Sequence, residues 1–179
     1  MQIEIATLGN GCFWCTEAIF QQLKGVLKVT SGYCGGHMLN PDYKSVCTGE
    51  TGHAECLEIE YDAEIIKFED LLEIFWKTHD PTTLNRQGGD VGTQYRSVIF
   101  YHNSNQLDIA KAYRDQLESS KVYSNTIVTS FEPITKFYPA EDYHQGYFIE
   151  NGHNPYCEMV VRPKVEKFQK IFSSILKNK

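Results

Sequence analysis

The first positions of the chain alternate between apolar and polar side chains. This period of two over residues 3–7 (Ile-Glu-Ile-Ala-Thr) predicts a strand, and the turn-forming residues at 9–11 (Gly-Asn-Gly) end it. Apolar positions then recur at helical spacing over 14–23, and Lys-Gly at 24–25 predicts the end of this helix. A second strand is predicted at 26–33. The chain therefore opens as a β-α-β unit.

The strand period of two and the helical spacing of apolar residues both recur in the rest of the sequence. They predict strands at 56–61, 97–101 and 127–131, and helices at 68–76, 106–117 and from 163 onward. Residues 37–52 and 80–93 are rich in glycine, proline and polar side chains, which predicts two loops. Loops of that length in compact domains are usually functional or disordered.

This order of elements favours helices packed on a sheet. Alternation of strands and helices is typical of an α/β or α+β layer sandwich, and parallel pairs within each β-α-β unit would cross over right-handed. No repeat or linker interrupts the chain. We expect one domain over 1–179, with a core at about 3–163 and a C-terminal helix at 163–178.

Composition narrows the class of protein. The 179 residues are 41% hydrophobic and 22% charged, which suits a folded domain, and the net charge is −6. An acidic chain is a poor match for nucleic acid or an anionic membrane surface. No apolar run approaches the ~20 residues that span a bilayer, and the first residues lack the basic start of a secretory signal. We expect a soluble, cytoplasmic protein.

Six cysteines need an explanation, because a reducing cytosol makes a disulfide framework unexpected. Cys12 and Cys15 are the pair that lies close in sequence. Cys12 follows the first strand at the start of the first helix, where free N–H groups and the helix dipole lower the pKa of a thiol. A strand-to-helix turn also places such a sulfur at an open end of the sheet. Cys12 is therefore the candidate nucleophile.

A Cys-x-x-Cys pair by itself leaves several functions open. It is compatible with thiol–disulfide exchange, with half of a zinc site, or with coincidence. A zinc-binding module would need a second close pair of ligands, which the other cysteines do not form. A Cys-His acyl-transfer enzyme would pair Cys12 with His53 or His144. A satisfied structural role is the more usual one for either histidine.

Five short stretches of sequence, in a fixed order and spacing, make the sequence pattern specific. They are GCFW at 11–14; GYCGG at 32–36; PDYKSVC at 41–47 with TGHAE at 51–55; QGGDVGTQYRS at 87–97; and FYPAEDYHQ at 137–145. In this order and spacing the chain closely resembles the A-type peptide methionine sulfoxide reductases, over roughly residues 3–163. The resemblance implies a two-layer, ferredoxin-like α/β (α+β) sandwich with a mixed sheet and a C-terminal segment packed over the site.

The same resemblance implies an activity. Members of this family reduce the S epimer of methionine sulfoxide, free or in proteins, and so repair oxidative damage. The reaction passes through a sulfenic acid and an intramolecular disulfide that thioredoxin reduces, without a metal or organic cofactor. By resemblance, thioredoxin is the partner, and we expect a monomer.

The family's functional residues map onto this chain one by one. The matching positions are Cys12 for the nucleophile, Phe13 and Trp14 for the aromatic walls around the substrate methyl group, Glu55 for the buried acid, Tyr43 and Tyr95 for two hydroxyls, and Asp90 for a further polar group. The chemistry requires such groups, because a sulfoxide oxygen leaves only when it is protonated. A carboxylic acid kept neutral by burial can supply that proton.

Two cysteines compete for the step that closes the cycle. A sulfenic acid on Cys12 condenses with a nearby thiol to a disulfide. Cys157 matches the resolving position of many members, whereas Cys15 matches a subset in which the close pair is the redox couple; most members carry glycine there. Both assignments stay open. Cys34 and Cys56 fit small packing residues, and the role of Cys47 is open.

Overall fold

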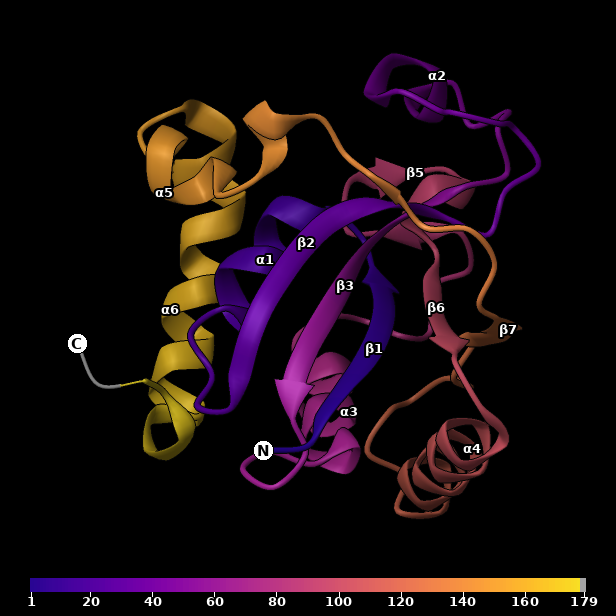
Figure 1. The fold of residues 1–179 in the computed structure, drawn as a ribbon, viewed down its shortest axis with the longest axis vertical. Coiled ribbons are helices and arrows are strands. Elements are labelled where there is room, and N and C mark those ends of the chain that lie inside the picture. Colours follow the sequence, from indigo (N-terminus) through magenta and orange to yellow (C-terminus); the bar gives the residue numbers. More distant parts are fainter. Residues whose placement is uncertain (178–179) are drawn as a thin grey trace.

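The computed structural model describes residues 1–177, and its strands form one large sheet and one small one (Figure 1). The large sheet has the order β7-β6-β1-β3-β2-β8. Its strands are β1 (Ile3–Asn10), β2 (Val26–Cys34), β3 (Ala54–Asp62), β6 (Ser97–Tyr101), β7 (Ser130–Pro133) and β8 (Tyr138–Pro139). The short strands β4 (Arg86–Gln87) and β5 (Asp90–Val91) pair only with each other.

The helices surround this sheet. They are α1 (Phe13–Phe20), α2 (Tyr43–Cys47), α3 (Phe68–Lys77), α4 (Ser104–Ser119), α5 (Tyr147–Asn151) and α6 (Arg162–Ile171). Three 3-10 turns lie at Thr93–Tyr95, Asp142–His144 and Ser173–Ile175, and a π-helical turn at Cys157–Val161 leads into α6. Within residues 1–177 no helix combines the length and the apolar character needed to cross a membrane.

The strand order confirms the two-layer ferredoxin-like sandwich. Strand β3 lies between β1 and β2, and β1 lies between β3 and β6, all in antiparallel pairs. The units β1-α1-β2 and β3-α3-β6 are therefore interleaved. The expectation of parallel pairs within each unit was wrong, because an antiparallel strand separates the two parallel members. Direct parallel pairing joins β6 and β7, which α4 connects.

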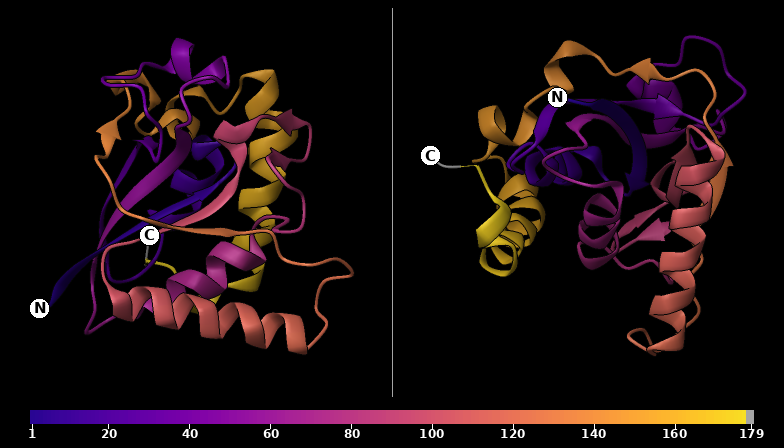
Figure 2. Two further views of the ribbon diagram at one scale, coloured as in Figure 1. Left: turned by 90° about the vertical axis from the view of Figure 1, so that its right-hand side faces the viewer. Right: turned by 60° about the horizontal axis from the view of Figure 1, so that its bottom comes forward.

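Helix α1 is the inner helix of the molecule. All its residues except Trp14 are buried, since α6 packs against the side of α1 that faces away from the sheet (Figure 1). Helix α3 is amphipathic instead: it buries Leu71, Leu72, Phe75 and Trp76, while its polar positions face outward. Figure 2 shows α4 at the far end of the molecule from α2 and α5. Helix α1 is thus enclosed by the sheet and by α6.

Several boundaries differ from the sequence predictions. The loop predicted at 37–52 contains α2, which begins because the Asp42 side chain accepts the Ser45 N–H at 2.8 Å as an N-cap. The loop predicted at 80–93 contains the β4–β5 hairpin. The helix predicted over 14–23 ends at Phe20, and the strand predicted at 127–131 runs over Ser130–Pro133.

The C-terminal helix predicted at 163–178 ends early, at Ile171. The reason is pairing with the turn that follows α1. The Lys24 N–H donates to the Ile175 carbonyl at 2.9 Å, and the Lys177 N–H donates to the Gln22 carbonyl at 2.7 Å. These bonds accompany the change from the α-helix to the 3-10 turn at Ser173–Ile175. Residue 178 lies outside the described residues.

Candidate active site at the start of helix α1

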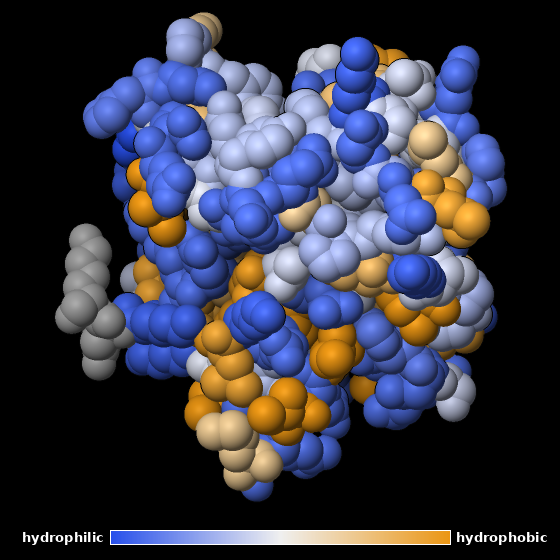
Figure 3. All heavy atoms as spheres, turned by 45° about the horizontal axis from the view of Figure 1, so that its top comes forward, coloured by the Kyte–Doolittle hydropathy of each residue, from blue (hydrophilic) through white to orange (hydrophobic). Residues whose placement is uncertain are grey.

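The site lies where β1 ends and α1 begins, near α2 and the C-terminal segment (Figure 1). Two glycines make this turn. Gly9 has no room for a side chain, because a Cβ would lie 2.9 Å from the Glu55 carbonyl oxygen, and Gly11 has φ +105°. Figure 3 looks toward this end of the molecule, where hydrophilic and intermediate residues predominate. The turn presents Cys12 immediately before the helix.

Cys12 is the N-cap residue of α1 and is half-buried. The structure corrects the expected shift of its pKa. Contact with the Cys15 thiol and burial raise the pKa of Cys12, and the backbone N–H of Trp14 opposes them only in part. The same contact lowers the pKa of Cys15. Of the two thiols, Cys15 therefore gives up its proton more readily than Cys12.

Glu55 faces this pair from β3. Its side chain is 2% exposed, and its Oε1 accepts the Phe13 N–H at 3.3 Å. Burial, and next the negative charge of a Cys12 thiolate, raise the pKa of Glu55 well above its usual value. The physical consequence is a neutral carboxylic acid beside the thiol. Glu55 is therefore a buried acid, as the sequence analysis predicted.

Two tyrosines lie near the same carboxyl group. Tyr43 begins α2 and Tyr95 ends the 3-10 turn at Thr93–Tyr95. Burial raises the pKa of both phenols, and the charge of Glu55 raises each further, so both hydroxyls stay protonated. The structure brings Tyr43 and Tyr95 together with Glu55 and Cys12, as the sequence predicted.

The aromatic residues after Cys12 have different environments. Phe13 is 1% exposed and its ring lies 5.1 Å from that of His144. Trp14 is half-buried, and its indole N–H donates to His144 Nδ1 at 3.0 Å. The ring of Tyr147 stacks on Trp14 with 3.8 Å between centroids and 8° between planes. One face of Trp14 is therefore covered by Tyr147 of α5.

Tyr156 is a site residue that the sequence analysis missed. Its hydroxyl donates to Asp90 Oδ2 at 3.0 Å, and it lies close enough to the Cys12 thiol for each group to shift the pKa of the other. Burial and the charge of Cys12 raise the pKa of this phenol, so it remains a donor. Asp90 thus reaches the thiol through Tyr156. The signal was present in the sequence, because Tyr156 directly precedes Cys157.

Three thiols lie close together. Cys157 is fully buried at the start of the π-helical turn, and the charge of Cys12 contributes to raising its pKa, after burial. The charge of Cys157 in turn acts to raise the pKa of Cys15. All six cysteines are free thiols. Cys34 and Cys56 pack in a small cluster with Val98 and Phe100, which confirms their predicted packing role.

Neither histidine of the acyl-transfer alternative contacts Cys12. His53 accepts the Gly36 N–H at 3.0 Å and bonds the Met38 carbonyl at 2.7 Å, which is a satisfied structural role. His144 instead positions Trp14 through the indole bond. Within residues 1–177 there is no group of three or more His, Cys, Asp or Glu side chains placed to hold a metal ion. The geometry favours thiol chemistry.

Glu17 ties the C-terminal segment to α1. It is 5% exposed; one oxygen accepts the Ser31 hydroxyl at 2.8 Å and the other accepts the Gly146 N–H. These bonds give Glu17 a supporting role, because they join α1 to β2 and to the segment before α5. Gln145 adds a second tie, because its side chain bonds the backbone of Ser31.

Replacing Glu17 by alanine is expected to lower the free energy of unfolding by about 2 kcal/mol or more, because buried donors at Ser31 and Gly146 lose their acceptor. Chemical denaturation measures this loss, and hydrogen exchange should show reduced protection over 143–151. Glu166→Ala, at an exposed position of α6, is the matched control. Equal effects of the two substitutions would contradict the anchoring role.

Comparisons with known proteins agree with this arrangement. A family model described as "Peptide methionine sulfoxide reductase" matches residues 4–176. A curated relative, "Peptide methionine sulfoxide reductase MsrA" of Polynucleobacter asymbioticus, is 55% identical over 97% of this chain and 92% of its own. Among solved structures, reduced Mxr1 from Saccharomyces cerevisiae is similar with a TM-score of 0.81 and 35% identity, covering 87% of this chain and 90% of that one. Mxr1 in complex with Trx2 is similar with a TM-score of 0.58 and 27% identity, covering 82% and 85%.

Proposed function

Because the chain belongs to the peptide methionine sulfoxide reductase family, we propose that it reduces the S epimer of methionine sulfoxide, free or in proteins, with Cys12 as the nucleophile. The observation that carries this proposal is the buried carboxyl group of Glu55 beside the Cys12 thiol, where burial raises its pKa and favours the protonated acid. A thiol without an acid could not expel a sulfoxide oxygen, and an acid without a thiol could not accept it.

The first step transfers one oxygen atom. The Cys12 sulfur attacks the sulfoxide sulfur while Glu55 donates a proton to the sulfoxide oxygen. Oxygen passes to Cys12 as a sulfenic acid, and the substrate leaves as the thioether methionine. Tyr43 and Tyr95 donate hydrogen bonds that strengthen as charge gathers on the oxygen. Asp90 holds Tyr156 beside the thiol by accepting its hydroxyl proton. The nucleophile is oxidised by the same two electrons that reduce the substrate.

The neighbouring Cys15 thiol offers a way to activate Cys12. The two thiols act on each other's pKa, so transfer of the Cys12 proton to a Cys15 thiolate would make Cys12 the thiolate. Tyr147 stacks on one face of Trp14, which leaves the opposite face for the substrate. Phe13 and Trp14 would then enclose the substrate methyl group in an apolar aromatic socket.

The second step forms a disulfide and releases water. Cys15 is in contact with Cys12, whereas Cys157 is enclosed in the π-helical turn. We therefore assign the first attack on the sulfenic acid to Cys15, with Cys157 exchanging afterwards. Thioredoxin reduces this disulfide, consistent with the Mxr1–Trx2 complex. The cycle needs a reducing compartment, which supports a cytoplasmic location, and one chain supplies the whole site, which supports a monomer.

The order of thiol exchange is testable with two single variants. After one equivalent of substrate, Cys157→Ser should form the Cys12–Cys15 disulfide at the wild-type rate, whereas Cys15→Ser should accumulate the sulfenic acid. Both variants should release one methionine per enzyme and turn over more slowly with thioredoxin. Peptide mapping by mass spectrometry identifies the bridge, and a first disulfide to Cys157 in the wild-type protein would reverse the order.

The proposed activity is tested with a peptide that contains methionine sulfoxide and with dithiothreitol as the reductant. Loss of the S epimer alone, dependent on the reductant, is the expected result. Consumption of both epimers would contradict the assigned stereochemistry. An absence of turnover by the folded protein would overturn the proposal.

A further inference from the structure

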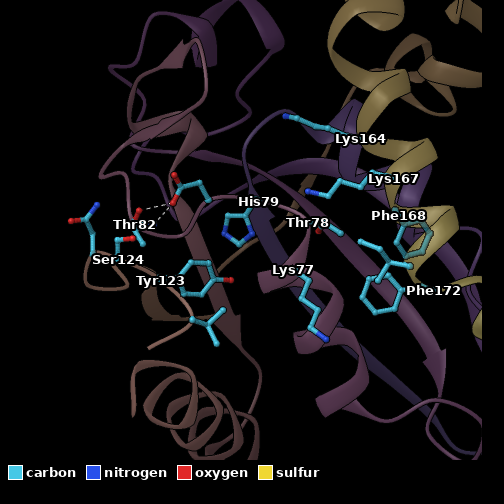
Figure 4. Close-up of a pocket in the computed structure, with 14 residues that line it drawn as sticks. Lys77, Thr78, His79, Thr82, Tyr123, Ser124, Lys164, Lys167, Phe168 and Phe172 are labelled. Atoms are coloured by element: carbon cyan, nitrogen blue, oxygen red, sulfur yellow. Dashed lines mark hydrogen bonds between the residues drawn. The ribbon is translucent and has the colours of Figure 1, made fainter. Parts of the chain in front are cut away.

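A cavity of about 530 Å³ lies away from Cys12 and Glu55, between the end of α3, the loop at 122–125 and one face of α6 (Figure 4). Its floor is apolar, because Phe168 and Phe172 belong to the buried core. Sites for small molecules have volumes of ~300–1,000 Å³ and combine apolar walls with a few polar groups. The size suits a small organic molecule.

Positive charge gathers around this cavity, although the whole chain has a net charge of −6. Lys77, Lys164 and Lys167 all line it. Lys77 is opposed by Glu73 at 2.6 Å. Within residues 1–177 no carboxylate lies within 4.0 Å of the ammonium group of Lys164 or Lys167. Figure 4 shows both side chains extending from α6 into the cavity.

The remaining polar lining fits the same charge pattern. One carboxylate, that of Asp80, borders the cavity, and it accepts the N–H and the hydroxyl of Thr82 at 2.9 and 2.6 Å. Ser124 and Asn125 add neutral donors on the opposite wall. Two unopposed ammonium groups above an apolar floor match a molecule with an anionic head and an organic body. Phosphate oxygens are frequent partners of lysine.

We propose that this cavity binds an organic phosphate, with its phosphate group between Lys164 and Lys167 and its organic part on the floor formed by Phe168 and Phe172. Nothing in the sulfoxide chemistry requires such a ligand. The site is thus separate from the catalytic one, although the two share a helix contact.

Lys164 connects the cavity to the redox pair. It lies in the first turn of α6, which packs against α1. The groups that act on Cys15 are the Cys12 thiol and the Lys164 ammonium, which lower its pKa, and Asp90 and Cys157, which raise it. A bound phosphate would offset the charge of Lys164. Occupation of the cavity is therefore expected to raise the pKa of Cys15, a consequence for turnover that rests on the proposed function.

Calorimetric titration of the whole protein tests the site. Phenyl phosphate is expected to bind more tightly than inorganic phosphate at equal ionic strength, because only the ester reaches the apolar floor. The double variant Lys164→Met/Lys167→Met should bind phenyl phosphate at least about tenfold more weakly. Lys170→Met removes one charge from the same helix outside the cavity and should bind like the wild type.

Three outcomes would overturn the proposal. No heat of binding at physiological ionic strength would exclude a phosphate site. Equal affinity for inorganic and phenyl phosphate would exclude the organic part. An equal loss in Lys170→Met would show a general charge effect rather than a site.

A second readout tests the connection without any sulfoxide reduction, so its failure is distinct from failure of the proposed function. The pH midpoint for alkylation of Cys15 by iodoacetamide should rise with saturating phenyl phosphate. Lys164→Met should show the higher midpoint with or without the ligand. An unchanged midpoint in the wild-type protein with bound phenyl phosphate would break the connection to Cys15.

Discussion

Replacing Glu55 by glutamine is expected to lower kcat for methionine sulfoxide reduction by about 10²- to 10⁴-fold, the usual contribution of a positioned general acid. The amide keeps the shape of the side chain and can still accept the Phe13 N–H. The amide cannot act as a general acid, because it does not give up a proton to the sulfoxide oxygen. The loss therefore falls on proton delivery rather than on packing, and KM should change far less than kcat.

The pH profile distinguishes this role from a structural one. Glu55 is the active acid while it is protonated, and its pKa is raised, so wild-type activity should decline as pH rises through that value. The Glu55→Gln variant should lack this alkaline decline. Glu60→Gln, on the same strand, is the matched control and should keep the wild-type profile. An alkaline limb that persists in Glu55→Gln would assign the titration to another group.

Glu55→Gln should also change how the free energy of unfolding depends on pH. A glutamate titrates at about 4.3 in the unfolded chain. Because the folded protein holds the Glu55 proton more tightly, the stability that this proton contributes is complete below that value and is lost as pH rises through the raised folded pKa. Relative to the wild type, Glu55→Gln should therefore be more stable at pH 9 than at pH 4. Denaturation at both values measures the difference.

Replacing Cys12 by serine is expected to reduce sulfoxide turnover to the background rate. A serine hydroxyl is a far weaker nucleophile than a thiol, and it has no sulfenic acid to form with the transferred oxygen. The loss should appear in a single turnover with dithiothreitol in excess, so a recycling defect cannot explain it. Electrophoretic or mass analysis should also find no disulfide after addition of substrate.

Cys47→Ser provides the control for Cys12→Ser. Cys47 is an exposed thiol on α2, and the Tyr43 hydroxyl hydrogen-bonds its sulfur. Its replacement removes one thiol next to the site but leaves the nucleophile in place. The variant should release one methionine per enzyme as the wild type does. Turnover by Cys12→Ser, or an absence of turnover by Cys47→Ser, would show that a cysteine other than Cys12 is the nucleophile.

The regular elements could be predicted because their apolar positions follow one period throughout. Strand Ser97–Tyr101 is buried along most of its length, and helix α3 keeps one apolar face, so each has a clear pattern. Helix α2 was missed because its five residues give too few periods, although Asp42 carried the cap signal. Pairing partners could not be predicted, since alternation reports which face is buried and not which strand is adjacent.

The positions of the site residues could be predicted, but their electrostatics could not. The start of a helix suggests a lowered pKa for Cys12, and that effect acts through the Trp14 N–H. The neighbouring Cys15 and burial outweigh it, and the burial depends on segments far away in the sequence that pack over α1. Tyr147 and Tyr156 likewise join the site through packing of a distant segment, which no local pattern reports.

The turn at Cys157–Val161 contains one residue more than an ordinary helical turn. If it tightened, the chain before it would rotate by roughly 100° about the axis and advance by about 1.5 Å. Tyr156 would then swing off the nucleophile as Cys157 left its enclosed position. A shift of one residue in the winding of this turn would thus uncover Cys12 and release Cys157 in a single movement.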